Sequence, residues 1–600
     1  MKPFGRYRTH GAGTLRDEHD GETVTLAGWV DRRRDHGGVA FLDLRDASGI
    51  VQVVADAGEG EAEEVLAAAH DVRGEWVVQV RGTVRRRPEG MANPELATGA
   101  VEVAAESLDV LAVAETPPFP LTERVETDEN LRLEHRYLDL RRPGVGDAIR
   151  LRARITSVIR EVMERHGFLD IETPMLTRST PEGARDFLVP SRLQPGSVYA
   201  LPQSPQLFKQ LLMVAGLERY YQIVRCFRDE DLRADRQPEF TQLDVEASFV
   251  DEEDLYGLVE ELMATLWERV LGVEIPTPFP RITYEAAFAR YGTDAPDTRF
   301  DLRLTDLGEV FSGTEVGVFR SALDEGGSVI GWRLPDGGQL SRKQFDGWVE
   351  FAQRRGAKGL AWGVVESGEG GSGPALRSPL SKFMADDEIT ALLVATQARL
   401  GDAIFFGAGP TRQTQELMGA LRVAAAREHE LVPAGKWAFT WVTEAPVVEW
   451  NVDEARWEAV HHPFTAPTDD SLHKLEADPA AARARAYDLV LNGTELGGGS
   501  IRIHRRDTQE RVFDLLGVGH EEAREKFGFL LDALAYGAPP HGGIAFGLDR
   551  LAMLMADKRS LRDVIAFPKT QSGSDPLTSA PAPVDAAQLR DLGLRTLPKE

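Results

Sequence analysis

The sequence predicts a multidomain α+β protein, and three observations carry that prediction. The chain has 600 residues, which is too many for one hydrophobic core, and a typical domain size of about 150 residues suggests three or four units. Strand-like segments follow one another through the first 111 residues. Further along, an apolar helical stripe in residues 151–167 precedes strand-like segments at 220–227 and 240–249.

The first 111 residues are expected to form a small β-barrel. Five strand-like segments cover residues 23–30, 38–46, 49–55, 75–85 and 100–111, and a helical segment near residues 61–70 separates the third from the fourth. That order matches an OB-fold, a barrel whose exposed face takes single-stranded nucleic acid. Residues 1–111 are therefore predicted to be a nucleic-acid-binding domain. Residues 112–140, which contain PPFP, are predicted to be a stiff hinge.

Composition restricts the compartment. Cys226 is the only cysteine, so a disulfide framework and a cysteine-cluster zinc site are excluded, and a small buried hydrophobe is its expected role. The N-terminus lacks the apolar core of a signal peptide, and no stretch approaches the roughly 20 apolar residues of a membrane span. We expect a soluble cytoplasmic protein with no membrane partner.

The net charge of −27 argues against indiscriminate binding to nucleic acid, because phosphate contacts rely on lysine and arginine. Two arginine clusters, Arg32 to Arg34 and Arg85 to Arg87, nevertheless fall in the predicted barrel. Such patches allow RNA binding while the rest of the surface stays acidic. We expect salt-sensitive but selective RNA binding.

Residues 227–244, FRDEDLRADRQPEFTQLD, place three arginines and six carboxylates between two strand-like segments. A hairpin bounded by apolar strands can hold such charges inward, and arginine forks can take the oxygens of a triphosphate in bidentate fashion. The alternative is a charged hairpin with a purely structural role.

This hairpin resembles motif 2 of the class II aminoacyl-tRNA synthetases. Residues 151–167, followed by GFLDIETPML, resemble motif 1, which forms the dimer interface in that family, and residues 542–554, GGIAFGLDRLAML, resemble motif 3. Three such elements in the family's order are a specific signal. Along nearly the whole chain the sequence is similar to aspartyl-tRNA synthetases of bacterial type. This implies a homodimer whose catalytic domain is built on an antiparallel sheet.

The resemblance also implies a domain plan. Residues 141–283 and 421–570 would form the catalytic domain, and residues 284–420, which contain none of the three motifs, would form an inserted α+β domain. Residues 571–600, rich in proline, alanine and serine, are expected to be a loosely ordered extension.

A pocket selective for aspartate must hold a second carboxylate, so it needs buried cations. By resemblance Lys209 and Arg502 bind the side-chain carboxylate of the substrate. The same resemblance places Glu182, Ser204, Gln206 and Asp244 around the amino group and backbone of aspartate, has Arg228 contact its reacting carboxylate, and has His461 of HHPFT close over it. His461 could instead be a satisfied structural histidine.

The ATP site is carried over in the same way. Arg228, Glu230 and Arg550 are the predicted catalytic residues, with Arg228 contacting the α-phosphate; the other predicted ATP contacts are Asp229, Arg236, Gln237, Phe240, Glu495, Gly547, Leu548 and Asp549. Arg236 and Arg550 would hold the distal phosphates, and Phe240 would stack on adenine. Asp488 and Glu495 are the predicted Mg²⁺ site, because hard oxygen ligands suit that ion. A solvated surface acid is the alternative for Asp488.

In the barrel, the resemblance places Phe41 to stack on an anticodon base and Arg34 and Gln52 to reach others; Phe41 could equally be barrel core. His36 and Gly90 match relatives that charge both aspartate and asparagine tRNAs, whereas a plain loop role is the alternative for His36. The resemblance thus predicts a non-discriminating enzyme, whose misacylated asparagine tRNA would pass to a separate amidotransferase.

The sequence therefore predicts an aspartate–tRNA ligase that uses ATP and Mg²⁺ and acts on tRNA(Asp) and tRNA(Asn). Alternatives are a strictly discriminating aspartyl enzyme, an asparaginyl or lysyl enzyme, and a catalytically silent RNA-binding paralogue. Two cations at the side-chain end of the pocket disfavour lysine by repulsion and asparagine because they would stay uncompensated. The presence of Arg228, Arg550 and Glu495 disfavours the silent paralogue.

Overall fold

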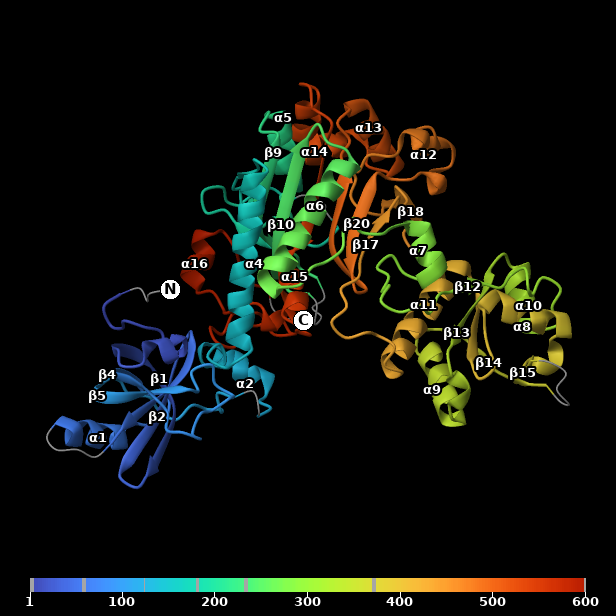
Figure 1. The fold of residues 1–600 in the computed structure, drawn as a ribbon. Helices are drawn as coiled ribbons and strands as arrows, with labels where there is room; N and C mark the ends of the chain where they lie inside the picture. The colour runs from blue at the N-terminus through green and yellow to red at the C-terminus, as the bar shows by residue number, and fades with distance from the viewer. Residues whose placement is uncertain are drawn as a thin grey trace. The chain divides into compact units, whose positions relative to one another are not determined.

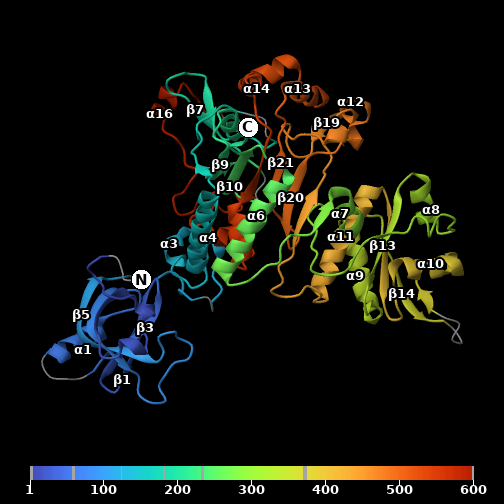
Figure 2. The same cartoon turned by 45° about the horizontal axis from the view of Figure 1, so that its top comes forward.

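The computed structural model describes residues 5–56, 61–122, 125–179, 183–230, 236–368 and 374–597. The chain divides into two compact units, Met1–Gly144 and Val145–Glu600 (Figures 1 and 2). Within the described ranges, no helix is both long enough and apolar enough to cross a bilayer.

The first unit is built on a closed five-stranded barrel with strand order β1-β2-β3-β5-β4. Its elements are β1 (Thr23–His36), β2 (Val39–Asp46), β3 (Gly49–Ala55), α1 (Glu61–Asp71), β4 (Val77–Arg86) and β5 (Val101–Ala112). Alternate residues such as Val24, Leu26 and Val30 point into a valine-rich core. The predicted OB-fold, with its helix between the third and fourth strands, is confirmed.

Strand β1 is longer than its apolar pattern predicts. The sequence indicates a strand ending at residue 30, yet pairing with β2 continues to His36, which lies opposite Val39. Gly37 and Gly38, both with positive φ, close the hairpin. The extension was missed because its residues are charged and exposed: backbone pairing holds it in the sheet, without an apolar face.

The end of the first unit contains two short helices, α2 (Glu129–Glu134) and α3 (Arg136–Asp139). The side chain of Asp128 caps α2 by accepting from the backbone N–H groups of Asn130 and Leu131. Asp139, fully buried, pairs with Arg136 and Arg132. Part of the stretch expected to be an aperiodic hinge is thus helical and anchored by buried charge.

The second unit contains an eight-stranded sheet with order β11-β17-β20-β21-β22-β10-β9-β6. The strands are β6 (Leu169–Asp170), β9 (Arg219–Phe227), β10 (Glu239–Ser248), β11 (Arg281–Thr283), β17 (Phe439–Thr443), β20 (Ala486–Leu491), β21 (Thr494–Ile501) and β22 (His541–Gly547). Within the described part of this sheet the central pairs are antiparallel, and the two edge pairs, β11 with β17 and β6 with β9, are parallel. The predicted antiparallel catalytic sheet is confirmed.

Helices α4 (Val145–Arg165), α6 (Glu252–Leu266) and α15 (Leu548–Met555) share one apolar core with this sheet (Figure 1). On β10, Leu243, Val245 and Ala247 enter that core, so Asp244 and Glu246 point to the opposite face. Other elements of the unit are β7 (Leu188–Pro190), β8 (Val198–Ala200), α5 (Gln206–Val214), α7 (Tyr284–Tyr291), β18 (Val448–Asn451), β19 (Arg456–Ala459), α12 (Lys474–Ala477), α13 (Arg506–Leu515) and α14 (His520–Leu534). The polar face of the sheet is where a site can form.

A second sheet, of five strands, lies between α7 and β17 in the chain, in order β12-β13-β16-β14-β15. It comprises β12 (Thr305–Asp306), β13 (Ser328–Leu334), β14 (Ala361–Ser367), β15 (Pro374–Arg377) and β16 (Ala403–Gly409), with α8 (Gly317–Asp324), α9 (Arg342–Gln353), α10 (Asp386–Thr396) and α11 (Thr411–Glu428). Separate apolar cores lie on it. This sheet carries the α+β character expected of the inserted region.

After α15 the chain has little regular structure. The described part, which ends at residue 597, holds a short 3-10 helix at Leu561–Asp563 and then α16 (Ala586–Asp591), which is capped by the side chain of Asp585. The C-terminal stretch therefore has more local order than its composition predicts.

Candidate active site

A cavity of about 760 Å³ opens on the polar face of the eight-stranded sheet. Strands β10, β20 and β21 of the sheet line it, together with residues 456–464 and helices α5, α13 and α14. The predicted site residues that line it are Ser204, Gln206, Lys209, Arg228, Asp244, His461, Asp488, Glu495 and Arg502. The fold thus gathers residues that lie almost 300 positions apart in the chain.

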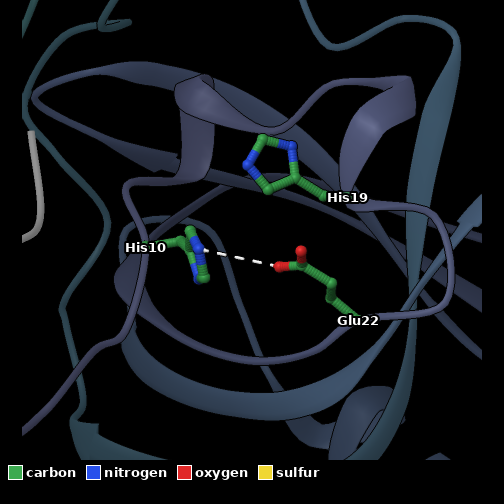
Figure 3. Close-up of side chains that lie close together, drawn as sticks. All are labelled: His10, His19 and Glu22. Carbon is green, nitrogen blue, oxygen red and sulfur yellow. Dashed lines mark ion pairs between the residues drawn. The ribbon is translucent and has the colours of Figure 1, made fainter.

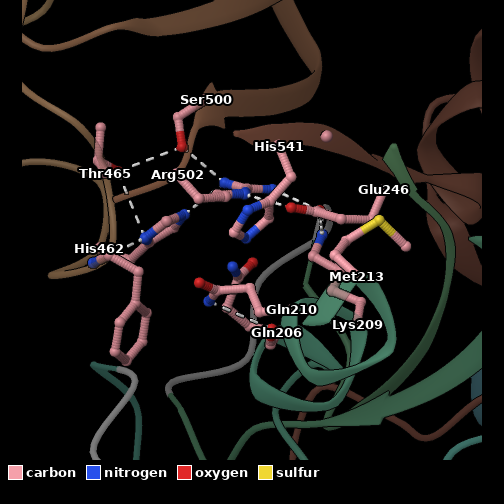
Figure 4. Close-up of polar contacts among 12 residues, drawn as sticks. Gln206, Lys209, Gln210, Met213, Glu246, His462, Thr465, Ser500, Arg502 and His541 are labelled. Atoms are coloured by element: carbon pink, nitrogen blue, oxygen red, sulfur yellow. Dashed lines mark hydrogen bonds and ion pairs between the residues drawn. The ribbon is translucent and has the colours of Figure 1, made fainter. Parts of the chain in front are cut away.

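The floor of this cavity holds Lys209, Asp244, Glu246 and Arg502, which we call the buried charge network. The Nζ atom of Lys209 lies 2.5 Å from Asp244 Oδ1 and 3.2 Å from Glu246 Oε2. Arg502 donates to both oxygens of Glu246, through Nε at 2.9 Å and Nη2 at 3.0 Å (Figure 4). Every member is at most 2% exposed. Two cations and two anions are therefore locked together away from water.

The two carboxylates of the network differ in their electrostatics. Burial acts to raise the pKa of Glu246, but the charges of Arg502 and Lys209 outweigh it and lower that pKa to about 2. For Asp244, burial is the larger effect and the pKa is raised despite Lys209. Its Oδ2 atom is buried and has no hydrogen-bond partner in the described part of the chain. Asp244 therefore presents an unsatisfied acceptor where the cavity begins.

Two adjacent histidines lie beside the network. Burial and the charge of Arg502 lower the pKa of His461 to about 4 and place that of His462 well below its ordinary value. His462 Nε2 lies 2.7 Å from Arg502 Nη1, which also donates to Ser500 (Figure 4). Both imidazoles are neutral at pH 7, so His462 can accept the hydrogen bond that orients Arg502.

Sequence reasoning missed Glu246 and His462. Glu246 had a usable signal: it follows Asp244 by two positions on one strand, which puts both carboxylates on the same face. His462 had none, because a tandem histidine does not reveal which ring points inward.

Arg228, Arg236 and Arg550, which we call the arginine rim, are more exposed. The Arg228 guanidinium lies 5.1 Å from the centroid of the Phe240 ring. Arg236 pairs with Glu230 at 3.0 Å, and its side chain is 49% exposed. Arg550 donates to the backbone carbonyl of Glu495 at 2.7 Å. The rim leaves guanidinium N–H groups facing solvent, as an anion site requires.

Other predicted ATP contacts are held by the protein itself. Asp549, 2% exposed, accepts from the backbone N–H of Thr241 at 2.7 Å and pairs with Arg152 at 2.5 Å. Gln237 exchanges two hydrogen bonds with the backbone of Lys569. Neither is among the described residues that line the cavity. The same holds for Asp229, Glu230, Arg236, Phe240, Gly547, Leu548 and Arg550. These positions shape the region around motifs 2 and 3.

Asp488 lies within β20 opposite Gly498 of β21, and Glu495 lies near the start of β21. A Cβ atom at Gly498 would lie 2.5 Å from Asp488 Oδ1 and 3.6 Å from Glu495 Oε1, so a larger residue would fill the space between the carboxylates. Burial, then the charges of Glu495 and Asp294, raise the pKa of Asp488 well above its ordinary value. Crowded hard-oxygen donors of like charge are the donor set that Mg²⁺ favours. The residues fit the ion, with Asp294 as a neighbour that the sequence did not indicate.

Glu182, also predicted to face the substrate, lies outside the described residues. Gly183, which follows it in the chain, and Ser204 line the cavity. Gln206 lines it too, and its Nε2 atom is buried with no hydrogen-bond partner in the described ranges.

On the barrel, Arg34 donates to Asp43 at 2.7 Å and to Gln52 at 3.3 Å, and Gln52 donates to Glu102. Phe41 is half-buried and lies outside the barrel core, on the face it shares with Asp43. The alternative that Phe41 is barrel core is therefore wrong. His36 is exposed at the end of β1, and Gly90 has a φ of 79° in the loop after β4.

A family model described as tRNA synthetases class II (D, K and N) matches residues 128–571, and one described as an OB-fold nucleic acid binding domain matches residues 24–111. The chain belongs to the class II tRNA synthetases. This confirms the family expected from motifs 1, 2 and 3. The synthetase is thus an enzyme of the ATP-dependent, tRNA-charging class.

Two curated relatives are similar over nearly the whole synthetase. A protein of Salinispora arenicola is 55% identical over 595 residues, covering 99% of this chain and 96% of its own, and one of Syntrophomonas wolfei is 53% identical over 588 residues, covering 98% and 99%. Both are named aspartate–tRNA(Asp/Asn) ligase. Among solved structures, an asparaginyl-tRNA synthetase of Pyrococcus horikoshii matches with a TM-score of 0.56 at 21% identity, covering 92% of this chain and 96% of its own, which supports the fold.

Proposed function

We propose that this synthetase is an aspartate–tRNA ligase that forms aspartyl-adenylate from L-aspartate and ATP and transfers the aspartyl group to tRNA(Asp) and tRNA(Asn). Relatives at 53–55% identity with that name support the assignment. The observation that carries it is the buried charge network, which sets two cations at the closed end of the cavity.

The network suits aspartate at both ends of its short side chain. Lys209 and Arg502 offer N–H groups to a side-chain carboxylate, while the free Oδ2 of Asp244 offers an acceptor to the α-ammonium group. Lysine as substrate would bring a third cation toward Lys209 and Arg502. Asparagine lacks the negative charge that aspartate brings to Lys209 and Arg502. The pocket therefore discriminates between the two amino acids by charge.

The arginine rim and Asp488 with Glu495 suit the triphosphate. Arg228 lines the cavity beside Phe240, so it can bridge the α-phosphate and the reacting carboxylate while the ring stacks on adenine. Asp488 and Glu495 would hold Mg²⁺, whose charge neutralises phosphate oxygens. Positioning and electrostatic stabilisation then suffice for adenylate formation, with no protein nucleophile.

The barrel would grip the anticodon loop through Arg34, Phe41 and Gln52, with His36 and Gly90 beside the last anticodon base. His36 is exposed next to the turn formed by Gly37 and Gly38, which leaves room for that base. We further propose a homodimer formed through α4 and the motif 1 segment, and delivery of misacylated tRNA(Asn) to an amidotransferase.

Pyrophosphate exchange with each of the twenty amino acids tests the substrate assignment. We expect exchange with aspartate, and exchange with asparagine or lysine but not aspartate would overturn the assignment of the pocket. Aminoacylation of purified tRNA(Asp) and tRNA(Asn) tests the second part. A wild type that charges tRNA(Asn) thousands of times less efficiently would show a strictly discriminating enzyme, and no exchange at all would favour a silent RNA-binding paralogue.

Asp488→Asn tests the metal site. We expect the Mg²⁺ concentration for half-maximal exchange to rise at least about tenfold, because one hard ligand and one charge are lost. Asp507→Asn is the control, since Asp507 pairs with Arg505 on the surface. An unchanged Mg²⁺ dependence in Asp488→Asn would remove this residue from the metal site.

A further inference from the structure

The N-terminal segment of the barrel unit contains a cluster that neither the tRNA chemistry nor the catalytic cavity uses. One ligand atom each from His10, His19 and Glu22 lies within 4.8 Å of the other two. Within the described part of the chain, it is the only group of three or more histidine, cysteine or carboxylate side chains whose ligand atoms lie this close together. Figure 3 shows the three side chains turned toward a common centre.

We propose that His10, His19 and Glu22 form a zinc-binding site. Two imidazoles and one carboxylate are a known zinc ligand set that leaves a fourth position for water. A tetrahedral zinc ion holds its ligand atoms roughly 3.4 Å apart, and His10 Nε2 already lies 3.9 Å from Glu22 Oε2. Small side-chain adjustments therefore close the site.

The hydrogen bond behind the His10 ring favours metal binding. The Nδ1 atom of His10 lies 3.1 Å from Thr9 Oγ1. The Nδ1 atom of His19 accepts from the backbone N–H of Arg16 at 3.1 Å and lies 3.2 Å from the Arg16 carbonyl oxygen. A zinc-bound imidazole uses one nitrogen for the metal and donates the other N–H to an acceptor of this kind. The His10 ring can thus turn Nε2 toward the metal while Nδ1–H stays bonded to Thr9. For His19 to offer Nε2, its ring proton must move to Nδ1, where the Arg16 carbonyl can accept it in place of the present bond from the Arg16 N–H.

The Thr9 hydroxyl is held as a hydrogen-bond acceptor for His10. Its hydroxyl accepts from the backbone N–H of Thr25 at 2.9 Å and donates to the Thr25 carbonyl at 3.3 Å. The hydroxyl proton is therefore committed to β1, and the oxygen remains an acceptor for His10 Nδ1–H. This chain of contacts orients His10 before any metal arrives.

Position in the fold gives the ion a structural consequence. His10 precedes the short helix at Ala12–Thr14, His19 ends the one at Asp17–His19, and Glu22 directly precedes β1. Zinc would tie this N-terminal segment to the first strand of the barrel. The ring edges of His10 and His19 already meet, with centroids 5.4 Å apart.

Zinc titration of the chelator-stripped, full-length protein tests the proposal. Competition with a chromophoric chelator gives the affinity, and elemental analysis after gel filtration gives the stoichiometry. We expect His19→Gln to lose one zinc equivalent, with an affinity at least about 100-fold weaker at that site, since even outer partners of a ligand contribute 10–100-fold. Thr9→Val, which keeps all three ligands, should weaken binding about tenfold.

His70→Gln is the matched control, because His70 lies in the same unit and pairs with Asp35. Zinc bound elsewhere, such as at Asp488 and Glu495, would be retained by every variant. Equal zinc content and affinity in the wild type, His19→Gln and a His10→Gln, His19→Gln double variant would overturn the site. Circular dichroism of each apo variant shows that a lost equivalent reflects the ligand and not unfolding.

Discussion

The buried charge network and the arginine rim hold their charges in opposite ways. In the buried charge network, Lys209 is 1% exposed and shares two carboxylates. In the arginine rim, the Arg236 side chain is 49% exposed and pairs with Glu230. The fold completes the network with buried partners, whereas the rim arginines stay half-buried or exposed.

The difference follows from desolvation. Burying an ion costs several kcal/mol, so it is stable only among satisfied partners, and removing one partner costs about 3–5 kcal/mol. An exposed pair contributes about 0–1 kcal/mol. The network should therefore couple substrate selection to folding, and the rim should act in catalysis alone.

The largest expected effect is on stability at the network. Glu246→Gln should lower the free energy of unfolding by about 3–5 kcal/mol, because Arg502 loses its buried counter-charge. Urea unfolding at pH 7 measures it. Glu230→Gln, which removes the partner of exposed Arg236, is the control and should cost less than about 1 kcal/mol. Similar small losses of stability in both variants would contradict the difference between the buried charge network and the arginine rim.

At the rim, Arg228→Ala should slow adenylate formation by about 10²–10³-fold, equivalent to about 2.7–4 kcal/mol, because a cation is removed where negative charge develops. Pyrophosphate exchange measures this loss. The midpoint of urea unfolding and the affinity for tRNA should stay near wild type. A variant that fails to fold would instead make the hairpin a structural element.

The histidines above the network give a pH dependence. The pKa of His461 is about 4 in the folded protein, below its ordinary 6.5, so the unfolded chain binds more protons between these values. Stability should therefore rise from pH 4 to pH 6.5, by about 3 kcal/mol from this group. His462 acts in the same direction.

Urea unfolding at several pH values, comparing the wild type with His461→Gln, measures that slope. The variant should show a shallower rise over the same window. An identical slope would mean that His461 is not buried as a neutral ring.

The smallest expected effect concerns the choice of tRNA. It separates the barrel from both the buried charge network and the arginine rim, because it leaves the cavity unchanged. His36→Leu should shift the ratio of charging of tRNA(Asn) to tRNA(Asp) by about 1–3 kcal/mol, the size of one base contact. Steady-state aminoacylation of both tRNAs measures it, and aspartate activation without tRNA should not change. Equal ratios in wild type and variant would remove His36 from discrimination.

Much of the fold was readable from local pattern. Alternating apolar residues predicted the barrel strands and their order, and the stripe in residues 151–167 predicted α4, because burial on one face imposes a period on the chain. The apolar pattern failed where strand pairing, and not burial, determines the conformation. The charged half of β1 is a strand only because β2 lies beside it.

The candidate site divides in the same way. The sequence by itself determined which charged residues belong to the site, since its resemblance to the synthetases indicated Lys209, Asp244 and Arg502, and all three reach one cavity. Only the tertiary structure decided their partners: Glu246 between the two cations, His462 against Arg502, and Asp549 turned to Thr241 and Arg152. An ion pair depends on side chains that meet across strands far apart in the chain, and no local period encodes that meeting.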